Sequence, residues 1–214
     1  MMRMMSMRKY GTIALLCVAW CVALTGCALH RSGAGEGELS AEERQKFEYF
    51  YLEAERQKAL DHDDAAFDLM SRAAEIDTAS AAARFFLAPY YLRLGLYDQA
   101  RGGLRYAAEQ HPENYWYNVV YANFSQQSGQ HDEAIRIWSR LLKQNPDKGE
   151  INSALAEAYT AKGDLKSAVA CYDSLESSMG IKAPITIEKL KLYEHMGDMD
   201  AMVFEACLLY TSDA

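Results

Sequence analysis

Small, apolar and polar residues recur along most of the chain with one long period. Four glycines stand 34 residues apart, at Gly95, Gly129, Gly163 and Gly197. Alanine keeps the same spacing at Ala100, Ala134 and Ala168, and Met202 takes that place in the last copy. A fixed period in the thirties is typical of a solenoid, in which each unit packs mainly on its neighbours.

The first half of each period predicts a helix. In the period that starts near residue 81, Leu87 and Tyr91 fall on one helical face. The small Ala88 lies beside them, where a neighbouring helix can approach closely. Gly95 is predicted to end this helix, because glycine adopts the left-handed backbone conformation at little cost.

The second half of the same period predicts another helix. Asp98 falls in its first turn, where a negative charge suits the helix dipole. Ala100, Leu104 and Ala107 form an apolar stripe on one face, and Pro112 ends the unit. Each period is therefore predicted to be a helical hairpin, and the whole fold to be all-α.

This pattern resembles the tetratricopeptide repeat. Residues 81–114 carry the residue types that the family favours, at Leu87, Ala88, Tyr91, Gly95, Ala100, Leu104, Ala107 and Pro112. Residues 115–148 and 149–182 match in the same register, 47–80 form a weaker copy with Asp61 where glycine is usual, and 183–206 form a partial last copy. The resemblance implies a right-handed α-solenoid of about five tandem repeats over residues 41–206, the last one truncated.

An uncharged apolar run, residues 11–24, follows a basic segment at the start of the chain. As a helix, this run would rise about 21 Å, which is short of the roughly 30 Å of a bilayer's hydrocarbon core. It therefore predicts the apolar region of a signal peptide instead of a stable membrane span.

The run ends in LTGC, residues 24–27, which resembles the lipobox of bacterial lipoproteins. The resemblance implies that residues 1–26 are a signal peptide, cleaved between Gly26 and Cys27, and that Cys27 carries diacylglycerol. Two or three lipid chains would hold the protein on a membrane, since each buried methylene contributes about 0.8 kcal/mol. An ordinary secretory signal with cleavage nearby is the alternative. The following residues, up to 40, are rich in Gly and Ser and are predicted to be a flexible linker, so that 27–40 form a lipidated tether.

Composition narrows the possible partners. Half of the residues are hydrophobic and 24% are charged, which is typical of a folded chain. Three of the 22 basic residues lie in the first 27 positions, so the rest of the chain sets 19 basic side chains against all 30 acidic ones. A body this acidic is a poor candidate for binding nucleic acid, which requires a basic patch.

Catalytic and metal-binding patterns do not emerge from the sequence. His62 stands beside Asp63 and Asp64, but an exposed loop between helices explains the three better than a metal site does. The sequence holds no HExxH, GxSxG, paired CxxC or phosphate-binding loop. Cys171 has no obvious disulfide partner in the mature chain and is predicted to be a buried thiol. We expect no enzyme activity, no metal and no cofactor.

The family resemblance also implies a binding surface, because tetratricopeptide arrays bind peptides or partner helices in a concave groove lined by the first helix of each repeat. The family's groove positions fall here on Tyr51, Lys58, Phe85, Arg93, Trp116, Asn123, Gln127 and Glu157. Trp116 and Phe85 are candidate aromatic anchors. The basic clamp that some relatives use for peptide carboxylates is not matched, and packing between repeats is the alternative role for these side chains.

The last eight residues, CLLYTSDA at 207–214, do not continue the repeat pattern. They resemble a translated sequencing adapter, so we interpret them as read-through beyond the native sequence. A natural short C-terminus is the alternative.

The leading hypothesis is a membrane-anchored scaffold or adaptor that mediates protein–protein interactions in the cell envelope. Its expected location is the periplasmic face of the outer membrane, to which the lipid on Cys27 would bind. The first alternative is the recruiting arm of a longer sensor or enzyme whose C-terminal domain is missing from this fragment. The second is a secreted binding protein without lipid.

Overall fold

The structure, a computed structural model, describes residues 39–212. The chain divides into two compact units, residues 1–45 and 46–214. The described part of the first unit contains the start of helix α2 (Ala41–Ala59), which Ser40 caps. The backbone N–H of Glu43 donates to Ser40 Oγ at 3.2 Å, and the backbone N–H of Ser40 donates to the Glu43 carboxylate at 3.0 Å. This reciprocal pair is a capping box. The predicted signal peptide, Cys27 and nearly all of the predicted linker lie outside the described residues.

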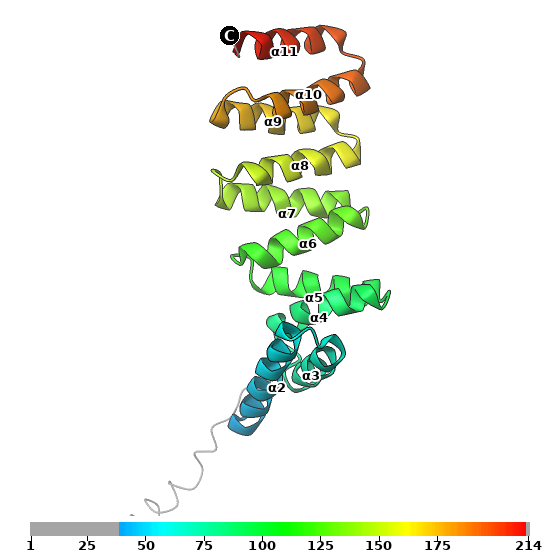
Figure 1. Ribbon diagram of the computed structural model, residues 1–214, viewed down its shortest axis with the longest axis vertical. Helices are drawn as coiled ribbons and strands as arrows, with labels where there is room; N and C mark the ends of the chain where they lie inside the picture. The colour runs from blue at the N-terminus through cyan, green and yellow to red at the C-terminus, as the bar shows by residue number, and fades with distance from the viewer. Residues whose placement is uncertain (1–38, 213–214) are drawn as a thin grey trace, which may run out of the picture. The chain divides into compact units, whose positions relative to one another are not determined.

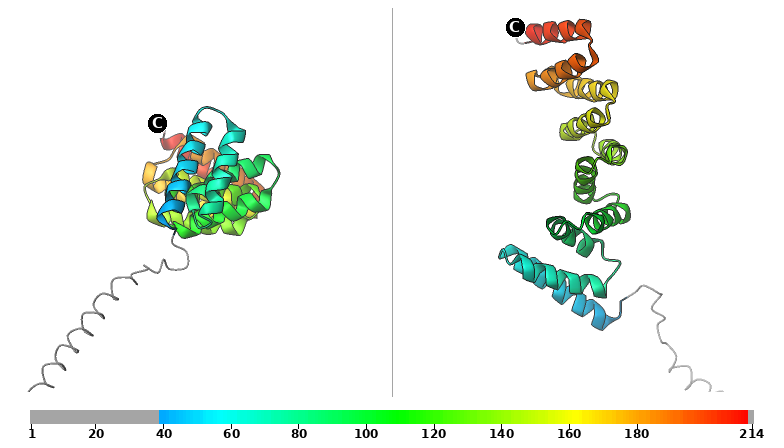
Figure 2. Two further views of the ribbon diagram at one scale, coloured as in Figure 1. Left: turned by 90° about the horizontal axis from the view of Figure 1, so that it is seen from below. Right: turned by 90° about the vertical axis from the view of Figure 1, so that its right-hand side faces the viewer.

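The second unit is a series of antiparallel helix pairs that follow one another in a single direction (Figures 1 and 2). After α2 come α3 (Asp63–Ile76), α4 (Ala81–Arg93), α5 (Tyr97–Gln110), α6 (Tyr115–Gln127), α7 (His131–Gln144), α8 (Gly149–Lys162), α9 (Leu165–Met179), α10 (Ala183–Met196) and α11 (Met199–Ser212). The first helices of the last four pairs begin at residues 81, 115, 149 and 183, so the structure keeps the 34-residue period. Across residues 39–212 there is no strand. The predicted all-α solenoid of about five helix pairs is confirmed.

The turn inside each pair depends on left-handed backbone. Gly95 has a φ of 72° between α4 and α5, and the backbone N–H of Leu96 donates to the carbonyl of Tyr91 at 2.8 Å. In the first pair, Asp61 takes the place of glycine and has a φ of 59°. Aspartate is among the few residues that tolerate this conformation, so the first turn forms without glycine.

Small residues allow the helices to approach closely. Ala100, Leu104 and Ala107 are buried, which confirms the predicted inward stripe of α5. Gly103, on the same helix, packs so tightly that an added Cβ would lie 2.8 Å from the backbone oxygen of Arg84 on α4. The buried side chains form two clusters, one from α2, α3 and α4 and a larger one from α4 to α10.

A buried lysine joins the last three helices. Lys189 of α10 is 3% exposed, and its Nζ lies 2.7 Å from Asp173 and 2.8 Å from Glu176, both on α9, and 2.6 Å from Glu205 on α11. Thr186 donates a further hydrogen bond to Glu176 at 3.0 Å. Burial alone would lower the pKa of Lys189, but its hydrogen bonds to the three carboxylates outweigh burial and raise that pKa. The ammonium is therefore held in its charged form.

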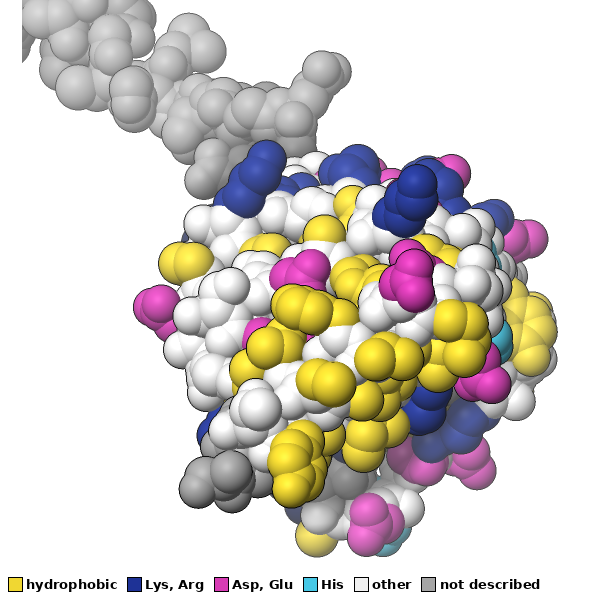
Figure 3. Space-filling view, turned by 90° about the horizontal axis from the view of Figure 1, so that it is seen from above, with side chains coloured by type: hydrophobic (Ala, Val, Ile, Leu, Met, Phe, Trp, Pro, Cys, Tyr) yellow, Lys and Arg dark blue, Asp and Glu magenta, His cyan; other side chains and the backbone are white. Residues whose placement is uncertain are grey.

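Helix α11 presents an apolar face at the end of the stack, where hydrophobic side chains gather (Figure 3). Val203 is 62% exposed, whereas Val169, at the equivalent position of α9, is 8% exposed because α10 packs on α9. The helix continues to Ser212 and so includes most of residues 207–214. That these residues are read-through beyond the native sequence stays a prediction. Within residues 39–212, no helix is both long and apolar enough to cross a membrane.

Candidate partner-binding groove

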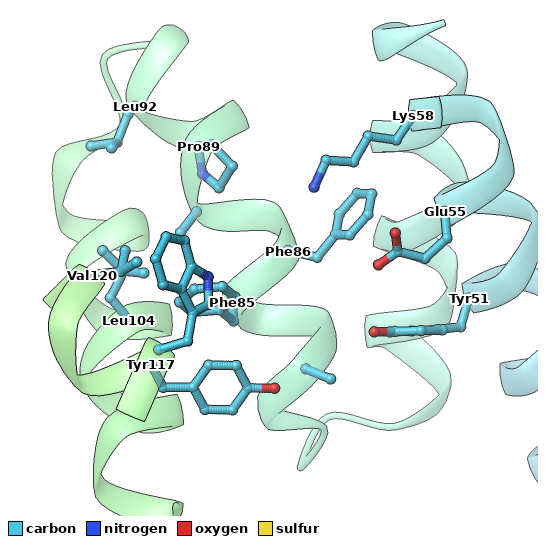
Figure 4. A pocket seen from close by; sticks show the side chains of 13 residues that line it. Tyr51, Glu55, Lys58, Phe85, Phe86, Pro89, Leu92, Leu104, Tyr117 and Val120 are labelled. Carbon is cyan, nitrogen blue, oxygen red and sulfur yellow. The ribbon is translucent and has the colours of Figure 1, made fainter. Parts of the chain in front are cut away.

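A cavity of about 430 Å³ lies among α2, α4 and α6, the first helices of three successive pairs (Figure 4). It is lined by Tyr51, Glu55 and Lys58 of α2, by Ala82, Phe85, Phe86, Ala88, Pro89 and Leu92 of α4, by Leu104 of α5, and by Trp116, Tyr117 and Val120 of α6. The volume is within the range of cavities that bind small ligands or single bulky side chains.

The two sides of the cavity differ in polarity. From α2 come the hydroxyl of Tyr51, the carboxylate of Glu55 and the ammonium of Lys58, which Figure 4 shows on one side. The opposite side is largely hydrophobic, with Phe85 and Val120 among its side chains. An occupant would therefore meet rings and aliphatic groups on one side and polar groups on the other.

Aromatic rings make up much of the lining. The rings of Phe85 and Tyr117 lie 4.5 Å apart at 37°, and Lys58 Nζ lies 4.5 Å from the centroid of Phe86. Trp116 is 60% exposed although it lines the cavity. A large aromatic surface is thus open to a partner, and such residues dominate the energy of protein interfaces.

Two phenol groups face each other across the cavity, as Figure 4 shows for Tyr51 and Tyr117. Burial raises the pKa of Tyr51, and the neighbouring Glu55 carboxylate raises it further. Burial also raises the pKa of Tyr117. Both hydroxyls therefore stay protonated at neutral pH, where they can donate as well as accept hydrogen bonds.

A family model described as tetratricopeptide repeat matches residues 125–178, from the end of α6 to the end of α9. The same helix pair and the same period extend from α4 to α10. Residues 125–178 carry tetratricopeptide repeats. This match confirms the resemblance to the tetratricopeptide repeat that the sequence indicated.

Solved structures of other proteins share this fold. MamA AMB-1 is 15% identical, with a TM-score of 0.63 over 79% of this chain and 93% of that one. MamA from Desulfovibrio magneticus RS-1 is 10% identical, with a TM-score of 0.61 over 78% of this chain and 94% of that one. A chain in the structure of Naa15/Naa10 bound to HypK-THB is 20% identical, with a TM-score of 0.61 over 77% of this chain but 26% of that one. At these identities the likeness concerns the fold alone. A comparison with curated proteins finds no match.

The array of helix pairs brings several of the predicted groove residues together. Tyr51, Lys58, Phe85 and Trp116 come from three helices and line the same cavity. Their contact with a partner stays a prediction.

Other predicted groove residues lie elsewhere. Arg93 is not in the cavity lining; its guanidinium pairs with Asp63 at 3.0 Å and lies over the ring of Tyr90. Gln127 lines a different hollow with Tyr97 and Arg101, among others. The cavity does not include Asn123 or Glu157, which are exposed on α6 and α8.

Sequence reasoning missed part of the lining. Glu55 and Pro89 stand 34 residues apart and share a register with Asn123, so the period could have identified both. Phe86 and Val120 form another pair with this spacing. Leu104 lies on α5, the second helix of its pair, and the rule that first helices line the groove could not include it.

Reactive groups are scarce in the described part of the chain. Residues 39–212 contain no group of three or more His, Cys, Asp or Glu arranged to hold a metal ion. His62 Nδ1 lies 2.7 Å from the side-chain oxygen of Gln57. Cys171 is buried, as predicted, and burial raises its pKa to about 11, so the thiol stays protonated and unreactive.

Proposed function

We propose that this protein is a membrane-anchored tetratricopeptide scaffold that binds partner proteins in the groove formed by α2, α4 and α6. The observation that carries the proposal is the aromatic cavity with the exposed Trp116 at one side. Tetratricopeptide arrays are interaction scaffolds, and the proposal assigns no catalytic residue.

The physical argument is one of desolvation. A partner side chain that fills the cavity removes apolar surface from water on both molecules, at about 25 cal/mol for each Å² buried. Aromatic side chains are suitable contacts because they have few rotatable bonds and therefore lose little conformational entropy when binding orders them. Their surroundings are already packed, as the Phe85–Tyr117 contact indicates, so little reorganisation is needed before binding.

The proposal also includes an anchor in the cell envelope. It rests on the sequence: a basic start, a short apolar run, LTGC, and a Gly- and Ser-rich tether after Cys27. A lipid on Cys27 would keep the groove close to a membrane, on the periplasmic face of the outer membrane, where partner complexes would assemble.

Site-specific photo-crosslinking in the native host tests the groove. A photoreactive phenylalanine analogue replaces Trp116 in one variant and Tyr49 in another; these side chains are similarly exposed, at 60% and 64%. Tyr49 is the control because residues two apart on a helix point about 200° apart, so it faces away from Tyr51 and the cavity. We expect a crosslinked partner band from position 116 that is missing from position 49. A band of equal strength at both positions, or none at 116, would contradict the groove assignment.

A further inference from the structure

The face that contains the cavity continues along the later repeats. Since α4, α6, α8 and α10 begin 34 residues apart, residues separated by 34 occupy equivalent places on successive first helices. Glu55 and Pro89 line the cavity, and the same row continues through Asn123 of α6 to Glu157 of α8. The row therefore starts at the Glu55 carboxylate in the cavity, reaches the Glu157 carboxylate, and ends on α10 at Lys191, which pairs with Glu188.

The chemistry changes along this face. On α4 and α6, the row and its neighbouring positions hold apolar and uncharged polar residues, such as Phe85, Leu92, Val120 and Asn123, with Arg93 as the exception. On α8 and α10, four positions in these rows hold carboxylates, Glu150, Glu157, Glu188 and Glu194, whereas the residue that follows Glu157 in its row is Lys191. An occupant that spans both regions must suit an apolar end and an acidic end.

Two of these four carboxylates have a cation nearby. Glu188 pairs with Lys191 at 2.7 Å, and Glu150 accepts a hydrogen bond from Tyr115, whose ring lies under Lys148 Nζ at 3.5 Å. In the part of the chain that the structure describes, neither Glu157 nor Glu194 forms an ion pair. The region thus keeps an excess of negative charge.

The field of these carboxylates reaches a buried side chain. Burial, together with the carboxylates of Glu188 and Glu157, raises the pKa of Tyr172 to about 12. The carboxylates come from successive first helices, and both act on this one phenol of α9. Of the two, Glu188 is paired with Lys191, so in the described part of the chain Glu157 is the carboxylate without an ion pair.

We infer that the groove selects an extended segment of a partner protein that carries an aromatic side chain for the cavity and, a few residues away, a lysine or arginine for Glu157. This inference rests on the proposed function and adds the chemistry of the partner. The rings of Phe85 and Tyr117 and the polar wall of α2 suit an aromatic group with a polar tip, such as tryptophan. A cation beside Glu157 gains attraction, whereas a carboxylate there meets a like charge.

Defined peptides test the inference with the full chain purified in detergent. Three short synthetic peptides share one central tryptophan and differ in the flanking residues, which are lysine, glutamine or glutamate. Binding is measured by fluorescence anisotropy at low and at high salt. We expect the lysine peptide to bind about tenfold more tightly than the glutamate peptide, with the glutamine peptide between them, and the difference to shrink at high salt.

Two variants and a control locate the effect. Glu157→Gln should weaken the lysine peptide about two- to fivefold and leave the glutamine peptide unchanged. Trp116→Ala should weaken all three peptides at least about tenfold, since an exposed aromatic anchor is lost. Glu75→Gln, an exposed glutamate on α3, should change none of them. Circular dichroism spectra identical to that of the parent protein would show that each variant is folded.

Contrary results separate this inference from the proposed function. If the glutamate peptide binds as tightly as the lysine peptide, while Trp116→Ala still weakens both, the charge preference is wrong and the groove survives. If neither Glu157→Gln nor Trp116→Ala changes the affinity for the lysine peptide, or if no peptide binds, the inference is wrong. The scaffold proposal is then judged by the crosslink at position 116, which does not depend on any chosen peptide.

Discussion

At the scale of single residues, two adjacent glycines of α5 have opposite roles. An added Cβ at Gly102 would meet no atom within 4 Å, whereas at Gly103 it would lie 2.8 Å from the backbone oxygen of Arg84. From the sequence, both glycines are expected to weaken the helix equally, because helix propensity assigns the same cost to every glycine inside a helix. The contact with α4 decides which of the two is required.

Alanine substitution should separate the two positions. Gly102→Ala should raise the free energy of unfolding by about 0.5–1 kcal/mol, because it removes the backbone entropy cost of glycine in a helix. Gly103→Ala should lower it by about 1–3 kcal/mol, because a rigid carbonyl occupies the required space. Urea denaturation followed by circular dichroism measures both. Changes of the same sign would contradict the close approach of α4 and α5.

At the scale of helices, Lys189 shows what the repeat pattern leaves unspecified. The 34-residue period and the pattern of apolar and polar residues identify α9, α10 and α11 as members of repeats. The same pattern would place Lys189 on the surface, because lysine is charged. Here one buried ammonium joins the three helices through Asp173, Glu176 and Glu205. Such a network depends on which side chains meet between repeats, and a pattern within one repeat does not contain that information.

Replacing this lysine should loosen the end of the stack. Lys189→Met should lower the free energy of unfolding by about 3–5 kcal/mol, since it leaves the largely buried carboxylates of Glu176 and Glu205 without their cation. Lys191→Met is the matched control, because its pair with Glu188 is exposed and worth about 0–1 kcal/mol. Hydrogen exchange should locate the loss in α9, α10 and α11. Equal effects of the two substitutions would contradict the account.

The same lysine predicts a dependence on alkaline pH. Its pKa in the folded protein is raised above the ordinary value of 10.5, so its stabilising contribution is complete below that pH. As the pH rises through the folded-state pKa, the lysine loses its charge and the contribution disappears. The difference in unfolding free energy between the parent protein and Lys189→Met should therefore be constant below pH 10.5 and narrow above it. If the difference in unfolding free energy widens above pH 10.5 instead, the interpretation that the pKa of Lys189 is raised is wrong.

At the scale of the whole molecule, the sequence predicts the architecture better than the site. The 34-residue spacing from Gly95 to Gly197 is enough to predict the helix pairs, because glycine turns and buried alanines recur with it. The groove positions follow from the same register, and Tyr51, Phe85 and Trp116 do line one cavity. The register could not show that Asp63 draws Arg93 into an ion pair, because that contact joins two different repeats.

The proposed lipid anchor can be tested directly. In a Gram-negative host given labelled palmitate, the full chain should take up label, and Cys27→Ser should abolish it. Cys207→Ser is the control for nonspecific acylation, because Cys207 is exposed, and it should leave the label unchanged. Label retained by Cys27→Ser would refute attachment at Cys27, and a full chain that takes up no label would favour a secreted protein without lipid.

The division of the buried side chains into two clusters has a mechanical consequence. Helix α4 contributes to both, through Phe86 in the smaller cluster and Ala88 in the larger one, and the cavity opens at this shared helix. A segment bound between Tyr51 and Val120 would touch side chains from each side of the boundary. It would therefore hold the two clusters together, so that a force applied at the start of α2 would meet greater resistance when the groove is occupied than when it is empty.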